Sequence, residues 1–401
     1  QHRLRVPNVK NLPSIGFTGQ AVAPGYFVVS LFTHWLKNTG SLNLMPALDI
    51  SKTLVELTID LCNIESVSSN EKYLADEVEK ILSAAPHLSV VRDGNALVAS
   101  TNLDRESRVL IAGHLDTVPV AGNLPAELHH FEREQVIVGR GSVDMKGGIA
   151  VMLKLAVELS EPRFDVTWIF YDNEEVASEL NGLGRLARNH PELIEGEFAV
   201  LCEPTSALVE GGCNGTVRVE ISMKGIKAHS ARPWMGENAI HSLMEPLQIL
   251  NSYQPETVNV DGLDYRESLN AVWVSGGIAT NVIPDAAILT VNYRFAPDKT
   301  AAEAIAKLRE VFVGFDLQVT DQAEGARPGL DREAAMHFVA ATGAKVGPKY
   351  GWTDVARFSE MAIPAVNYGP GDPSLAHADN ENVPVGHLFD VEAGLRGWLS
   401  L

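Results

Sequence analysis

Cysteine is scarce in this sequence, and long hydrophobic runs are missing. Cys62, Cys202 and Cys213 are the three cysteines among 401 residues. An odd and sparse set does not make a disulfide framework and is typical of a reducing compartment, so we predict a cytoplasmic protein. No apolar run reaches the roughly 20 residues that a membrane-spanning helix needs.

Positive charge is also in short supply. The chain has 32 Lys and Arg residues against 51 Asp and Glu residues, which gives a net charge of −19. Nucleic acids and anionic membranes attract basic surfaces, so we predict neither of them as a partner. If the substrate is an anion, individual Lys or Arg residues within the binding site must bind it.

Acidic residues are absent from the start of the chain. Residues 1–48 contain no Asp or Glu but several Lys and Arg residues. We interpret residues 1–45 as an N-terminal extension without an assigned function. An expression artefact, or upstream sequence translated before a natural start at Met45, is favoured over a targeting remnant.

From Pro46 onward, helix-like and strand-like segments alternate. Helical apolar spacing is present at 50–63, 70–84 and 147–160, and strand-like runs are present at 109–114, 135–140, 166–171 and 198–203. This alternation predicts an α/β domain whose mostly parallel or mixed sheet has helices on both faces. We assign residues 46–212 and 324–401 to that domain.

The pattern changes after residue 212. Residues 216–225 alternate strictly between apolar and polar side chains. The segments expected next are a helix at 238–252, strands at 269–276 and 286–295, a helix at 301–312 and a strand at 315–320. This βαββαβ order is the ferredoxin-like arrangement, so we predict that residues 213–323 form a second domain inserted into the first.

Acids and histidines follow the predicted strands of the α/β domain. The motifs are GHLDTVP at 113–119, GRGSVDMKGG at 139–148, NEE at 173–175, CEPT at 202–205 and AHADNE at 376–381. Ligands and catalytic groups gather at the carboxyl ends of parallel strands. His114 and Asp116 are two residues apart, so both side chains can point the same way, and the carboxylate can hold the histidine ring.

Each of these residues also has a structural explanation when it is taken alone. His114 could be a core histidine, His377 could be solvated, and the paired glutamates suit a surface turn. Asp144 could form a turn and Glu203 could cap a helix; a phosphate loop at Asp144 fits neither known glycine pattern. Together, however, two histidines and several carboxylates at strand ends favour a two-metal hydrolase site. Nitrogen and oxygen ligands without thiolate suit zinc, with cobalt or manganese as alternatives.

The motifs, their order and their spacing resemble those of the co-catalytic zinc aminoacylase/carboxypeptidase family of metallopeptidases. The resemblance extends from about residue 50 to the C-terminus. It is nearest to the desuccinylases that act on succinyl-diaminopimelate, in the stretches GCNGTVRVEISMKGIKAHSARPWMGENAIH, ATNVIPDA, YGWTDVARF and NYGPGDPSLAHADNENVP. It implies a zinc-peptidase-like catalytic domain with a mixed sheet and an inserted ferredoxin-like domain that acts as a lid and in dimerisation.

The resemblance implies two zinc ions held by five side chains. The implied ligands are His114 and Glu203 for one ion, Glu175 and His377 for the other, and Asp144 as the bridge. It further implies that Asp116 orients His114 and that Glu174 is the general base. The peptide between Asp144 and Met145 is expected to be cis.

Residues of the inserted domain are also implicated by the resemblance. Arg294 and Asn281 match positions that bind the substrate carboxylate and the oxyanion region. Thr353, from the catalytic domain, is expected to position the acyl group. His229, which alone suggests only a surface histidine, matches the histidine that stabilises the oxyanion. The inserted domain is expected to form a twofold-symmetric homodimer in which His229 enters the partner's site.

The chain departs from some desuccinylases near the start of the inserted domain. It has Cys213 and Asn214 where those enzymes carry arginines, and we name Arg232 or Arg357 as substitutes for binding the distal carboxylates.

We therefore predict a zinc-dependent amide hydrolase for a small acyl-amino-acid substrate, N-succinyl-LL-2,6-diaminopimelate, in lysine and diaminopimelate biosynthesis. An N-acetylornithine deacetylase or a small-peptide carboxypeptidase is the alternative, because such enzymes share one fold and metal site. A metal-free binding protein is a remote alternative.

Overall fold

The computed structural model describes residues 47–131 and 134–400, and its largest sheet has eight strands. In spatial order they are β1 (Ser89–Asp93), β2 (Ala96–Ser100), β6 (Asp165–Tyr171), β3 (Arg108–His114), β7 (Phe198–Leu201), β18 (Ala365–Asn367), β8 (Val209–Gly211) and β17 (Val346–Pro348). The central strands β6, β3, β7 and β18 are parallel, whereas β2 and β8 pair antiparallel with β6 and β18. The predicted mixed sheet is confirmed. The predictions for residues 1–45 lie outside the described residues.

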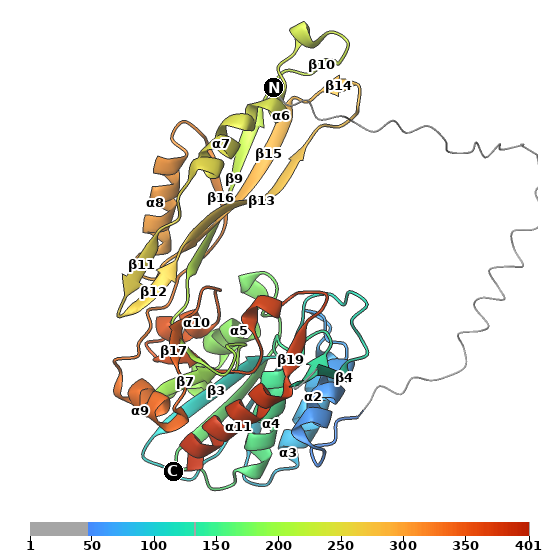
Figure 1. Cartoon of the computed structure of the whole chain (residues 1–401). Helices are drawn as coiled ribbons and strands as arrows, with labels where there is room; N and C mark the ends of the chain where they lie inside the picture. The colour runs from blue at the N-terminus through green and yellow to red at the C-terminus, as the bar shows by residue number, and fades with distance from the viewer. Residues whose placement is uncertain (1–46, 132–133, 401) are drawn as a thin grey trace, which may run out of the picture. The chain divides into compact units, whose positions relative to one another are not determined.

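Helices pack against both faces of this sheet (Figure 1). One face carries α2 (Leu54–Asn63), α3 (Lys72–Ser83), α4 (Lys146–Glu158), α9 (Glu333–Thr342) and α11 (Val385–Ser400), and the other carries α5 (Gly182–Asn189) and α10 (Val355–Glu360). Ile111 of β3 packs with the first group, and its neighbours Leu110 and Ala112 pack with the second. Because side chains alternate along a strand, a strand covered on both faces reads as a continuous apolar run. Among the described helices, none is long and apolar enough to cross a membrane.

A smaller sheet joins two distant parts of the chain. It consists of β19 (Asn382–Pro384), β5 (Glu134–Val138) and β4 (Glu127–Phe131). Asn382 of β19 pairs with Val138 of β5, close to where the chain enters the segment that contains Asp144. The loop that carries His377, just before β19, is therefore anchored beside that segment.

A separate four-stranded sheet has the order β13 (Ser268–Gly276), β15 (Ala286–Phe295), β9 (Gly215–Lys224) and β16 (Leu317–Ala323). The helices α6 (Ala239–Ser242), α7 (Met244–Ser252) and α8 (Ala301–Val311) belong to the same part of the chain. The chain order is the predicted βαββαβ. Val217, Val219 and Ile221 of β9 lie on the face that packs against α8 and its neighbours. The limits at residues 213 and 323 stay predictions.

Several element boundaries differ from the sequence expectation. The helix expected at 238–252 is divided at Leu243 into α6 and α7. Helix α2 begins at Leu54, because Thr53 and Glu56 form a capping box. The remaining elements are the strand pairs β10 (Ala228–His229) with β14 (Val282–Ile283) and β11 (Thr257–Val260) with β12 (Leu263–Arg266), and the 3₁₀ helices η1 (Ser178–Leu180), η2 (Pro191–Ile194), η3 (Pro233–Met235) and η4 (Pro373–Leu375).

Candidate metal centre

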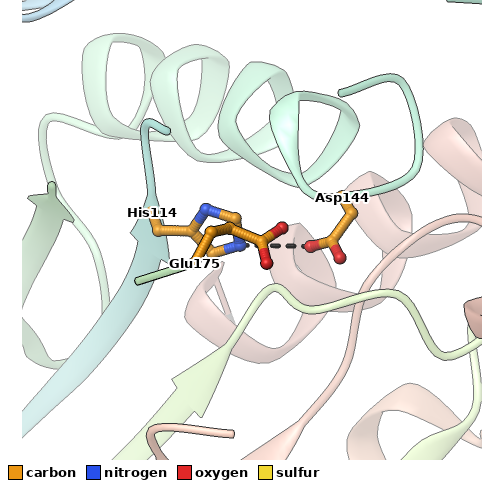
Figure 2. A group of neighbouring side chains, drawn as sticks. All are labelled: His114, Asp144 and Glu175. Atoms are coloured by element: carbon orange, nitrogen blue, oxygen red, sulfur yellow. Dashed lines mark hydrogen bonds and ion pairs between the residues drawn. The ribbon is translucent and has the colours of Figure 1, made fainter. Parts of the chain in front are cut away.

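His114, Asp144 and Glu175 meet at one edge of the eight-stranded sheet, with ligand atoms all within 4.8 Å of one another. Figure 2 shows the three side chains facing each other. His114 ends β3, Glu175 follows β6, and Asp144 lies just before α4. Because β3 and β6 are parallel neighbours, their carboxyl ends bring these residues to the same place. The Nε2 atom of His114 lies 3.1 Å from Oδ1 of Asp144.

The other two residues named as ligands lie against this group. Nε2 of His377 is 2.9 Å from Oε1 of Glu175 and 3.4 Å from Oδ2 of Asp144. Oε1 of Glu203 is 3.9 Å from Nε2 of His114. Asp144 therefore directs one carboxylate oxygen toward each histidine. The five residues form two histidine–glutamate halves with Asp144 between them.

A buried oxygen in this group lacks a hydrogen-bond donor. Glu203 is 5% exposed, and its Oε1 atom accepts no hydrogen bond within the described part of the chain. Burial raises the pKa of Glu203 to about 7. It also raises the pKa of the neighbouring Glu174 well above its usual range, and the negative charge of Glu203 adds to that shift. A buried carboxylate that accepts no hydrogen bond is unfavourable unless a cation compensates its charge. These histidine and carboxylate ligands therefore fit a metal ion.

The histidines of the group bind protons strongly. Hydrogen bonds to Asp144 and Glu175 raise the pKa of His377 to about 10. Burial disfavours the charged form of His114, yet hydrogen bonds to Asp116 and Asp144 raise its pKa well above the usual value. Burial likewise opposes ionisation of Asp144, but the two histidines lower its pKa. Metal ligands must be deprotonated, so protons and metal ions compete for this site.

Asp116 organises the region behind His114. Its Oδ1 accepts the backbone N–H of Glu174 at 3.0 Å, and its Oδ2 accepts the N–H of Glu175 at 3.1 Å and the Ser68 hydroxyl at 2.7 Å. The Nδ1 atom of His114 is closer to the backbone oxygen of Asp116, at 3.0 Å, than to its carboxylate, at 3.5 Å. The backbone of Asp116 thus holds the ring, while its carboxylate fixes the paired glutamates.

Glu381 supports Asp144 from the opposite side, and sequence reasoning did not assign it a role. Its Oε1 accepts the backbone N–H groups of Val143 at 3.0 Å and Asp144 at 3.1 Å. Its Oε2 accepts Nη1 of Arg140 at 2.7 Å, and both side chains are buried. This carboxylate therefore fixes the loop that carries Asp144.

The backbone around Asp144 has one feature expected from the sequence and one close approach at a glycine. The peptide between Asp144 and Met145 is cis, as predicted. Gly148 in the first turn of α4 lies directly against the carbonyl oxygen of Cys202, where a Cβ atom would collide. The glycine thus brings the start of α4 close to the end of β7, the strand that Glu203 follows.

A cleft of about 920 Å³ opens beside the metal centre, which is ample for a small ligand. Its walls come from the part of the chain that contains the eight-stranded sheet and from the four-stranded sheet. The residues lining it that sequence analysis had named are Asp144, Glu174, Glu175, Glu203, Arg294, Thr353, Arg357 and His377. His229, Arg232 and Asn281 are not among its lining residues. His229 and Asn281 lie instead at the strand pair β10–β14, where the backbone oxygen of Asn281 accepts the N–H of Ser230.

Comparison with known proteins identifies the family. Residues 110–400 match the model of peptidase family M20/M25/M40. The chain belongs to this family. The DapE protein of Mycobacterium tuberculosis is 52% identical over 355 residues, which cover 88% of this chain and 99% of that protein. The succinyl-diaminopimelate desuccinylase of Corynebacterium glutamicum is 43% identical over 368 residues, which cover 89% of this chain and 99% of that protein. The resemblance inferred from the motifs is confirmed.

A solved structure shows the same fold. The M20 family metallo-carboxypeptidase of Sulfolobus solfataricus superposes with a TM-score of 0.68 at 16% identity, covering 86% of this chain and 98% of that one. The M20 membership makes this chain an enzyme, a hydrolase of a metal-dependent family.

Proposed function

We propose that this chain hydrolyses N-succinyl-LL-2,6-diaminopimelate to succinate and LL-2,6-diaminopimelate, as a cytoplasmic enzyme of lysine and diaminopimelate biosynthesis. The observation that carries the hydrolytic part is the convergence of two histidine–glutamate pairs on Asp144 at the wall of a cleft. The identity of the substrate is inferred from the desuccinylase of Corynebacterium glutamicum, because this chain matches 99% of the length of that enzyme.

Two zinc ions are the cofactors in this proposal, with cobalt or manganese as substitutes. His114 and Glu203 would hold one ion, and Glu175 and His377 would hold the other. Asp144 is shared, which is supported by its two oxygens facing the two histidines. Zinc polarises a carbonyl group and lowers the pKa of bound water to about 7.

Glu174 is the general base in this scheme. It lines the cleft, and burial raises its pKa, which makes its carboxylate a stronger base than a free glutamate. Its carboxylate accepts a proton from the attacking water and then passes it to the departing amine nitrogen. Asp116 positions Glu174 by accepting its backbone N–H at 3.0 Å.

Arg294 and Thr353 bind the substrate from two walls of the cleft. A guanidinium binds a carboxylate with two parallel hydrogen bonds, so Arg294 is assigned to the carboxylate of the amino-acid part. The Thr353 hydroxyl donates to Oδ1 of Asn367 at 2.9 Å, which fixes its orientation beside the acyl group.

His229 and Asn281 act from a second subunit. Both lie at β10–β14, His229 is exposed, and neither lines the cleft of its own chain. A twofold-symmetric homodimer through the inserted domain is therefore proposed, with His229 donating to the developing oxyanion in the partner's site. Val272 and Trp273 on the edge strand β13 are 54% and 68% exposed, which supports an interface on this domain.

The substrate is tested by comparing turnover of succinyl-diaminopimelate, N-acetylornithine and a dipeptide by the zinc-loaded chain. We expect the highest kcat/KM for the succinyl compound. A preference for N-acetylornithine or the dipeptide would assign the chain to another amide hydrolase of the family. No turnover of any of the three by the fully metal-loaded chain would contradict the proposal.

A further inference from the structure

The cleft has two walls of opposite charge. The wall at the metal centre is acidic, and the wall formed by β9, β15 and β16 contains two arginines. Arg218, Arg294, Lys349 and Arg357 are the Lys and Arg residues that line the cleft. Because the whole chain carries a net charge of −19, an anionic substrate depends on these few groups.

Two of these four side chains already form ion pairs with carboxylates of the same chain. Nζ of Lys349 is 3.0 Å from Oε2 of Glu210, and both side chains are largely buried. Nε of Arg357 lies 2.5 Å from Oδ1 of the buried Asp354. Arg232, named from the sequence as a substitute for the missing arginines, does not line the cleft. Arg218 and Arg294 are therefore the remaining candidates.

Arg218 and Arg294 lie on the same face of neighbouring strands. Arg218 of β9 is opposite Asn292 of β15, and Arg294 is opposite Thr216, so the two arginines are diagonal neighbours. Such positions are about 7–8 Å apart, and like charges there repel. Burial and the charge of Arg218 both lower the pKa of Arg294.

These two arginines have few partners. The guanidinium of Arg294 makes no hydrogen bond or ion pair with any residue in the described ranges. Arg218 has one counter-ion, Asp321, at 3.5 Å, with side-chain exposures of 46% and 36%. A half-exposed pair of this length is weak, so a carboxylate entering the cleft can replace Asp321.

We infer that Arg218 binds the terminal carboxylate of the acyl chain and makes the site selective for a dicarboxylic acyl group. The inference rests on the proposed function, in which the substrate carries carboxylates on both sides of the amide and Arg294 takes the one on the amino-acid side. An acetyl group has no carboxylate for Arg218. Some desuccinylases carry arginines at the positions of Cys213 and Asn214, and Arg218 takes over their role here. Cys213 is buried, and the side chain of Asn214 donates to the backbone oxygen of Arg266.

The test compares Arg218→Gln with wild type on the N-succinyl and N-acetyl derivatives of the same diaminopimelate. A charge-assisted hydrogen bond corresponds to about a 10- to 150-fold change, so kcat/KM for the succinyl compound should fall by about that factor. The loss should lie mainly in KM, and Arg218→Lys should restore part of it. Turnover of the acetyl compound should stay within about twofold, because it makes no bond to Arg218.

Arg327→Gln is the matched control, since Arg327 pairs with Asp261 and does not line the cleft. It should leave both substrates unaffected. If turnover of the acetyl compound is too slow to measure, inhibition by the free acids is compared instead. Arg218→Gln should weaken inhibition by succinate and leave inhibition by acetate unchanged. Equal losses on both substrates, or no loss on the succinyl compound, would overturn the inference.

A failure of the proposed function gives a different result. In that case wild type itself does not hydrolyse the succinyl compound, whereas a failure of the Arg218 assignment leaves wild-type activity intact. Asp321→Asn adds an independent check, because it frees Arg218 from its counter-ion. It should lower KM for the succinyl compound, and a raised KM would count against the assignment.

Discussion

Replacing Glu381 with glutamine should destabilise the chain and weaken its metal binding. The carboxylate accepts three hydrogen bonds, from the backbone of Val143 and Asp144 and from Arg140. Glutamine keeps the shape of the side chain but presents an N–H₂ group to donors on one of its two sides. It also leaves the buried guanidinium of Arg140 without a counter-ion.

The magnitude follows from the burial of this pair. The side chains of Arg140 and Glu381 are 4% and 1% exposed, with a separation of 2.7 Å. Removing one partner of a buried ion pair costs about 3–5 kcal/mol. Because Asp144 loses a backbone anchor, metal affinity should also fall, by about 10- to 100-fold as for other residues that support ligands.

The assay is urea unfolding followed by circular dichroism, together with metal titration against a competing chelator. Glu392→Gln is the matched control, since it breaks a more exposed pair with Arg396, with side-chain exposures of 23% and 35%. That change should cost less than about 1 kcal/mol. If Glu381→Gln unfolds like the control and binds metal like wild type, the support assigned to Glu381 is wrong.

Three further predictions concern the metal centre and the proposed dimer. Glu174→Gln should keep its metal but lose about 10²–10⁴-fold in kcat, whereas Glu175→Gln should weaken one metal site; near-normal turnover of Glu174→Gln would reverse the assignment. Chelation should abolish activity and added zinc should restore it, as measured by amine release; full activity without metal would contradict the scheme. His229→Ala should lose about 2.7–4 kcal/mol of transition-state stabilisation, and mixing it with Glu174→Gln should restore activity through one intact site per heterodimer. Mixed dimers without activity would show that His229 does not act in the partner's site.

Much of the α/β fold could be predicted because its strands are buried on both faces. Apolar runs such as 166–171 then stand out, and the acids that follow them fall at one edge of the sheet. This is why the sequence motifs at His114, Glu175 and Glu203 predicted residues that the structure brings together.

Other features were missed although the sequence carries a sign of them. The hairpin β11–β12 turns at Asp261 and Gly262, which both have positive φ, and an Asp-Gly pair between strand-like runs is a typical hairpin turn. Glu381 lies four residues after His377 within a motif already singled out. The break at Leu243 also has a sign in the sequence, because Pro246 in the first turn of α7 has no N–H for the carbonyl of Ser242 and so disfavours one continuous helix.

Contacts between distant segments lie beyond local patterns. Ser68 donates to Asp116, 48 residues later in the sequence, and no periodicity relates the two. The alternation of β9 assigns Arg218 to its polar face, but it does not reveal that this face lines the cleft. Such long-range neighbours depend on how the sheets pack.

The central claim is a two-metal site built by five side chains, and metal content tests it most directly. Elemental analysis of the purified, zinc-loaded chain should give two ions per chain, and about one after His377→Ala, which spares the His114 and Glu203 half. Glu174→Gln should still hold two, because Glu174 is not a ligand. One ion or none in a fully active wild-type chain would contradict the account.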